Sequence, residues 1–120
     1  MIIEQEVNQL IEALTEPDYV NVVLLYGKTC GPCIHTKPHF EMVSNFFNKL
    51  RPEGLRFHQM DVWNEPNKVF KEHTTYESVP TIVVYQNNVE INRIKGSKNT
   101  LELRDFVFQI LEQVPSGTKS

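Results

Sequence analysis

The sequence predicts an α/β fold in three layers, in which helices cover both faces of a central mixed sheet of four to five strands. Two observations favour this class. Segments with the apolar pattern of a strand alternate along the chain with segments that have the pattern of a helix, and this alternation is typical of parallel sheets. The last two strand-like segments are separated only by Asn87-Asn88, which predicts a two-residue hairpin and therefore adds antiparallel strands.

The first elements follow from the spacing of apolar residues. Between Ile3 and Leu14 these residues recur at helical intervals, although Ile2 and Ile3 fit a very short first strand equally well. The run from Val20 to Tyr26 is apolar except for Asn21. A continuous apolar run of this length predicts a central strand that is buried on both faces.

The remaining elements complete one domain over residues 1–114, which leaves 115–120 as a flexible polar tail. Apolar residues at helical spacing predict a long helix after Cys30 and a last helix that ends near Val114. In chain order, the sequence predicts that long helix with a stop at 51–54, a strand over 55–62, a short helix after the turn at 64–66, strands over 81–86 and 89–94, and the last helix.

Composition excludes several classes of protein. The 120 residues carry a net charge of −3, which argues against a nucleic-acid-binding surface, because such surfaces need a clustered basic excess. No apolar run approaches the roughly 20 residues that span a bilayer. The first residues have no features of a secretory signal, so a cytoplasmic location is expected. Nothing in the sequence requires more than a monomer.

The motif that carries chemistry is Cys30-Gly31-Pro32-Cys33, at the junction of the buried strand and the long helix. Free backbone N–H groups and the helix dipole at this end favour a thiolate at Cys30, and the thiolate is the nucleophile in disulfide exchange. Lys28 is a nearby cation that adds to the effect. Cys33 lies one turn further along on the same side, where a more buried sulfur can resolve a mixed disulfide.

Other interpretations of the cysteine pair are weaker. His35 and His39 extend it to a pattern that resembles a zinc site. On one helix, however, Cys33 and His35 lie roughly 200° apart and cannot converge on one tetrahedral ion. A zinc site is therefore not expected. We expect a redox-active disulfide between Cys30 and Cys33 instead, and disulfide exchange requires no metal and no bound organic cofactor.

The chain resembles the thioredoxin family over about residues 1 to 113. The resemblance is specific because a CGPC motif is followed, in order and at similar spacing, by several further family features. These are Pro38, Asp61, Val79-Pro80-Thr81, the Asn87-Asn88 hairpin and Gly96.

The resemblance implies a thioredoxin fold and a docking site for protein substrates. Pro80 would be the family's cis proline, packed against the cysteine pair, and the Val79 backbone would pair with the extended chain of the substrate. The resemblance also implies a flat, mildly apolar docking surface formed by Gly31, Pro32, Val79, Gly96 and Ser97.

The sequence departs from the family at four positions. Thr29 replaces the tryptophan that usually precedes the first cysteine, and Tyr26 replaces another tryptophan but keeps an aromatic wall. Leu24 stands where the family has a buried aspartate that is thought to help deprotonate the second cysteine. Phe57 replaces the lysine beside that aspartate. The paired apolar replacement is physically consistent, because a lone buried charge would be costly.

We therefore expect a thiol–disulfide oxidoreductase that reduces protein disulfides, with a flavin-dependent thioredoxin reductase as electron donor. Two alternatives remain open. The fold is suited to a binding module or assembly subunit in which the cysteines are dispensable. A glutaredoxin-like, glutathione-dependent reductase is the other, although Lys95-Gly96-Ser97-Lys98 lacks the usual Gly-Gly turn.

Overall fold

The structure is a computed structural model that describes residues 2–50 and 53–114. Within them, five strands form one sheet in the order β1-β3-β2-β4-β5. The first three of these neighbours are parallel, whereas β4 is antiparallel to both β2 and β5. In chain order the elements are β1 (Ile2–Glu4), α1 (Val7–Leu14), β2 (Val20–Tyr26), α2 (Gly31–Leu50), β3 (Leu55–Asp61), the 3-10 helix η1 (Glu65–Glu72), β4 (Thr81–Gln86), β5 (Val89–Lys95) and α3 (Thr100–Gln113).

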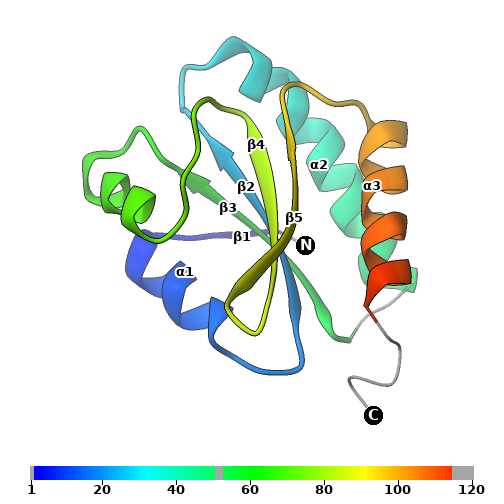
Figure 1. Cartoon of the computed structure of the whole chain (residues 1–120). Coiled ribbons are helices and arrows are strands. Elements are labelled where there is room, and N and C mark those ends of the chain that lie inside the picture. Colours follow the sequence, from blue (N-terminus) through cyan, green and yellow to red (C-terminus); the bar gives the residue numbers. More distant parts are fainter. Residues whose placement is uncertain (1, 51–52, 115–120) are drawn as a thin grey trace.

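The elements form three layers, which confirms the predicted fold class. Figure 1 shows α2 and α3 on one face of the sheet, and α1 with η1 (green) on the other. Each face has its own apolar cluster, because successive residues of a strand point to opposite sides. Thus Leu24 on β2 packs with the α2 and α3 cluster, whereas Leu25 packs with the α1 cluster.

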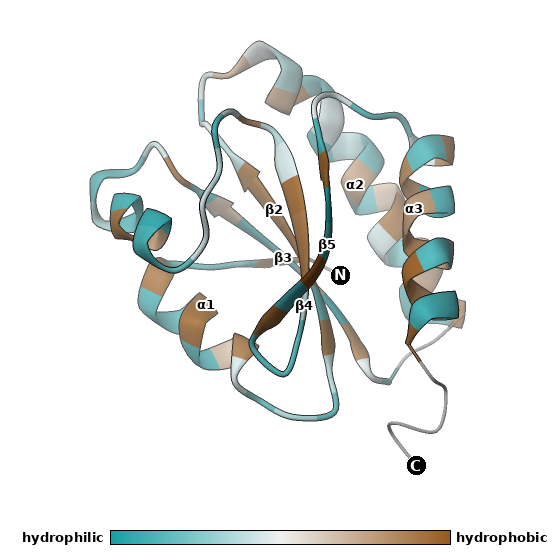
Figure 2. Ribbon diagram, in the orientation of Figure 1, coloured by the Kyte–Doolittle hydropathy of each residue, from teal (hydrophilic) through white to brown (hydrophobic). Residues whose placement is uncertain are grey.

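The central strands have the apolar character that the sequence predicts. All seven residues of β2 are buried, Asn21 included. Figure 2 shows β2 and β4 as mostly hydrophobic, in the middle of the sheet. In the part of the chain that the structure describes, no helix combines the length and the apolar character needed to cross a membrane.

Of the two alternatives left open for the first residues, the short strand is the correct one: Ile3 belongs to β1, because the chain pairs with β3 before α1 starts at Val7. Three other boundaries differ from the sequence prediction. The strand β3 ends at Asp61 rather than at residue 62. The short helix is a 3-10 helix that already includes Glu65 and Pro66, since proline is tolerated in a first helical turn. The last strand extends to Lys95. The predicted tail at 115–120, and residues 51–52 of the predicted helix stop, lie outside the described residues.

The hairpin between β4 and β5 is confirmed in its geometry. Asn87 and Asn88 have φ angles of 53° and 63°. Two successive residues in this left-handed region form the turn whose twist matches that of the flanking strands. The hairpin fixes β5 at the edge of the sheet.

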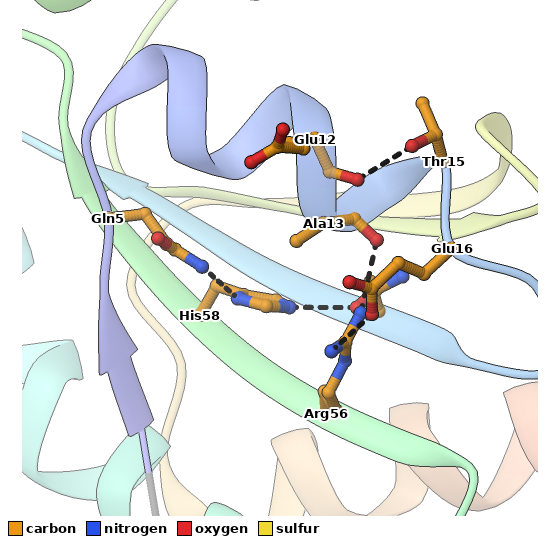
Figure 3. A network of polar contacts seen from close by, with 8 residues as sticks. Gln5, Glu12, Ala13, Thr15, Glu16, Arg56 and His58 are labelled. Carbon is orange, nitrogen blue, oxygen red and sulfur yellow. Dashed lines mark hydrogen bonds and ion pairs between the residues drawn. The ribbon is translucent and has the colours of Figure 1, made fainter.

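A buried polar network lies between the sheet and α1 (Figure 3). Gln5 Nε2 donates to His58 Nδ1 at 3.0 Å, and His58 Nε2 donates to Asn21 Oδ1 at 2.8 Å. This arrangement requires the neutral imidazole with its proton on Nε2. Arg56 extends the network, with a hydrogen bond to the Ala13 carbonyl at 3.0 Å and an ion pair to Glu16 at 2.8 Å.

The network predicts a loss of stability in acid. Burial, and then the charge of Arg56, lower the pKa of His58 from 6.5 to about 4. The unfolded chain therefore binds a proton more readily than the folded chain between these two values, so stability is complete above pH 6.5 and falls as the pH drops toward 4. We expect His58 to account for a loss of about 2 kcal/mol in the free energy of unfolding between about pH 7.5 and about pH 5.

Urea unfolding of wild type and His58→Gln at both pH values measures this contribution. The loss between the two pH values should be smaller in His58→Gln, because the titrating group is absent. His35→Gln, at an exposed position on α2, should retain the wild-type dependence. Equal pH dependence in wild type and His58→Gln would contradict the prediction.

Candidate active site

Cys30 is the residue that caps the N-terminus of α2. After β2 ends, the chain turns tightly, and the Cys30 N–H donates to the Gly27 carbonyl at 3.1 Å. The Cys30 carbonyl then accepts the first helical hydrogen bond, from Ile34 N–H at 3.0 Å. The Cys30 sulfur accepts from the Cys33 N–H at 3.2 Å, in the way that a capping oxygen does. A negative charge on this sulfur is therefore stabilised by a backbone N–H and by the helix dipole.

The two cysteines form a disulfide, and their surroundings differ. Cys30 is 7% exposed, whereas Cys33 is 0% exposed. The Cys33 sulfur accepts from the Gly27 N–H at 3.5 Å. The first sulfur is thus the one that an incoming group can reach, and the second is held behind it.

Val79 lies beside the disulfide, and the peptide bond between Val79 and Pro80 is cis. The Cys30 sulfur is 3.8 Å from the Val79 carbonyl oxygen. The Pro80 carbonyl accepts from the Gly96 N–H at 2.9 Å, so the end of β5 is tied to the same loop. The Val79-Pro80 segment therefore contacts Cys30 through Val79 and the end of β5 through Pro80.

A groove of about 810 Å³ runs along the exposed side of the disulfide. Of the residues expected to dock substrate, Gly31, Pro32 and Val79 line it. Gly96 and Ser97 lie outside this lining, next to Pro80 and to Thr36, whose hydroxyl donates to Ser97 Oγ at 3.3 Å. The full lining is Thr29, Cys30, Gly31, Pro32, Val62, Trp63, Lys68, Lys71, Tyr76, Glu77, Ser78 and Val79.

Tyr26 and Lys28 line a different, more polar cavity. The Tyr26 hydroxyl donates to Glu4 at 2.9 Å, and Lys37 lies 3.9 Å from the centre of the Tyr26 ring. Burial and then the Glu4 carboxylate raise the pKa of Tyr26. The aromatic wall that the sequence placed at Tyr26 is therefore not part of the groove, because this side chain is held by Glu4 and Lys37.

Sequence reasoning missed the aromatic residues that do line the groove, Trp63 and Tyr76. Trp63 follows β3, and a Cβ atom added to Gly27 would overlap its indole ring. The sequence analysis did not predict this contact between Gly27 and Trp63. The sequence offered two indications of it: Trp63 is the only tryptophan of the chain, and a glycine precedes the cysteine motif.

Leu24 and Phe57 belong to the same apolar cluster as the disulfide. They are 0% and 1% exposed. The paired apolar replacement predicted at these positions is thus accommodated in a closed core. Apolar surroundings of this kind disfavour a charged thiolate at Cys33.

Comparisons with known proteins agree with this geometry. Residues 2–109 match the family model described as Thioredoxin. Thioredoxin C-3 of Corynebacterium nephridii is 31% identical over 83% of this chain, which spans 64% of that protein. The crystal structure of Malassezia sympodialis thioredoxin superposes with a TM-score of 0.74 and 22% identity, over 91% of this chain and 89% of that one. Chlamydomonas reinhardtii thioredoxin f2 gives a TM-score of 0.71 and 23% identity, over 94% of this chain and 95% of that one.

Proposed function

The chain belongs to the thioredoxin family, and we propose that it reduces disulfide bonds of proteins by dithiol–disulfide exchange through Cys30 and Cys33. The observation that carries the proposal is the position of the cysteine pair. The Cys30 sulfur lies at a helix N-terminus and lines a groove, while Cys33 is sealed behind it. This arrangement suits one attacking and one resolving sulfur.

The proposed reaction starts from the dithiol form. The Cys30 thiolate attacks one sulfur of the substrate disulfide, and the other substrate sulfur leaves as a thiolate. Cys33 then loses its proton and attacks the Cys30 sulfur, which releases the second substrate thiolate. The net result is a reduced substrate and an oxidised Cys30–Cys33 pair, the state that the structure contains.

An external donor of two electrons must restore the dithiol after each turnover. We propose a flavin-dependent thioredoxin reductase in this role, and no metal or bound organic cofactor. The proposed setting is the cytoplasm, where thiols are kept reduced. The proposed working form is a monomer.

Reduction of insulin with dithiothreitol as electron donor tests the function. Wild type should accelerate the reduction well above the rate with dithiothreitol alone, and the double variant Cys30→Ser/Cys33→Ser should not. Equal rates with the two proteins would contradict the proposal and favour a binding module. Turnover of a glutathione mixed disulfide with glutathione as donor, but not of insulin, would favour a glutaredoxin-like enzyme.

A further inference from the structure

Trp63 forms one wall of the groove beside Cys30, and its position is fixed by neighbouring groups. The backbone N–H of Trp63 donates to Asp61 Oδ1 at 3.0 Å, and the backbone N–H of the preceding Val62 donates to the Tyr26 carbonyl at 2.8 Å. The indole ring covers Gly27, where even one added carbon atom would overlap it. The side chain nevertheless remains 48% exposed. The groove thus presents a pre-positioned aromatic surface next to the reactive sulfur.

The part of the groove formed by η1 is positively charged. Lys68 and Lys71 both line it, three residues apart on a 3-10 helix, where such residues lie on the same side. The Lys71 ammonium lies 5.1 Å from the centre of the Tyr76 ring, which also lines the groove. The charge of this lining is therefore opposite in sign to the net charge of the chain, which is −3.

Two carboxylates lie near these lysines without cancelling their charge. Glu65 pairs with Lys68 at 3.2 Å, but its side chain is 85% exposed, and ion pairs in water are weak. Glu77 lines the groove, is 89% exposed, and is paired with Lys95 at 3.9 Å. A carboxylate from a partner can therefore approach both lysines from the groove.

We propose that this groove binds an extended segment beside the substrate's disulfide, and that it selects segments with an apolar residue next to the cysteine and acidic residues further along. The apolar side chain packs on Trp63, and the carboxylates face Lys68 and Lys71. This inference rests on the proposed function and adds the substrate class to it. Charge complementarity is the argument for an acidic partner, since rim charges select partners chiefly by sign.

A pair of peptide disulfides tests the charge preference. Both peptides contain one cysteine next to a leucine, joined to thionitrobenzoate, and they differ only in flanking residues that are glutamate or lysine. Wild type should reduce the glutamate peptide with a kcat/KM about fivefold higher at low salt. The preference should disappear in Lys68→Gln/Lys71→Gln. Lys49→Glu, at an exposed position on α2, lowers the net charge by the same amount and should keep the preference.

Binding without turnover tests the same surface independently. In Cys30→Ser/Cys33→Ser, the fluorescence of Trp63, the only tryptophan, should change on titration with the cysteine-blocked glutamate peptide, and less with the lysine peptide. Replacing the leucine of the peptide by glycine should weaken binding to this double variant about fivefold, because the apolar contact with Trp63 is lost. Equal kcat/KM for both peptides, or a preference that persists in Lys68→Gln/Lys71→Gln, would overturn the inference. Reduction of neither peptide by wild type would instead overturn the proposed function.

Discussion

Replacing Cys30 by serine is expected to abolish disulfide reduction, whereas Cys33→Ser is expected to preserve the first attack and trap the substrate. The Cys30 sulfur is the one that lines the groove, so without it the substrate meets no nucleophile. Cys33 is 0% exposed and cannot take over that role. Turnover should fall by at least about 10³-fold in both variants, because each removes one of two sulfurs that act as a unit.

The two variants differ in the covalent complex that they form. Cys33→Ser mixed with a disulfide substrate should yield a stable mixed disulfide at Cys30, which intact-mass measurement detects. Cys30→Ser should yield none under the same conditions, and the double variant is the control for non-covalent association. A mixed disulfide at Cys33 in Cys30→Ser, formed as fast as the one at Cys30, would contradict the assignment of the attacking sulfur.

Local patterns in the sequence predicted most of the fold and the centre of the site. A continuous apolar run identified β2, and the two asparagines identified the hairpin, because both signals depend only on neighbouring residues. The cysteine pair was placed correctly at a helix N-terminus for the same reason. Ile3 was ambiguous, since three residues cannot distinguish a strand from the first turn of a helix.

The features that the sequence did not predict depend on contacts between distant segments. Trp63 reaches the site by packing on Gly27, which lies 36 positions earlier in the chain. His58 on β3 contacts Gln5, which follows β1, and Asn21 on β2. Its surroundings therefore depend on two neighbouring strands of the sheet. Neither contact leaves a periodic pattern, so they appear only when the register of the sheet is known.

Leu24→Asp is expected to lower the free energy of unfolding by about 3–5 kcal/mol at neutral pH, because it places a carboxyl group in a closed apolar core. Leu24 is 0% exposed and belongs to the cluster that contains Phe57 and Cys33. Burial disfavours the ionised carboxylate, so the folded-state pKa of the introduced group lies above its ordinary value of about 3.9. Relative to Leu24→Asn, the free energy of unfolding of Leu24→Asp should therefore be highest at low pH, and it should decrease as the pH rises through that folded-state pKa.

The same substitution tests how Cys33 loses its proton. We predict that an introduced base in the apolar cluster of the disulfide accelerates the resolving step near neutral pH, since Leu24 and Phe57 offer Cys33 no proton acceptor. The release of substrate from a preformed mixed disulfide at Cys30 should be faster in Leu24→Asp than in Leu24→Asn, which has a similar size and polarity but does not titrate.

Stopped-flow measurement of this step from acid to neutral pH gives the comparison, and urea unfolding of both variants shows whether they are folded under those conditions. Release at equal rates in the two variants would mean that proton removal from Cys33 does not limit the reaction, and that water or the departing thiolate accepts the proton.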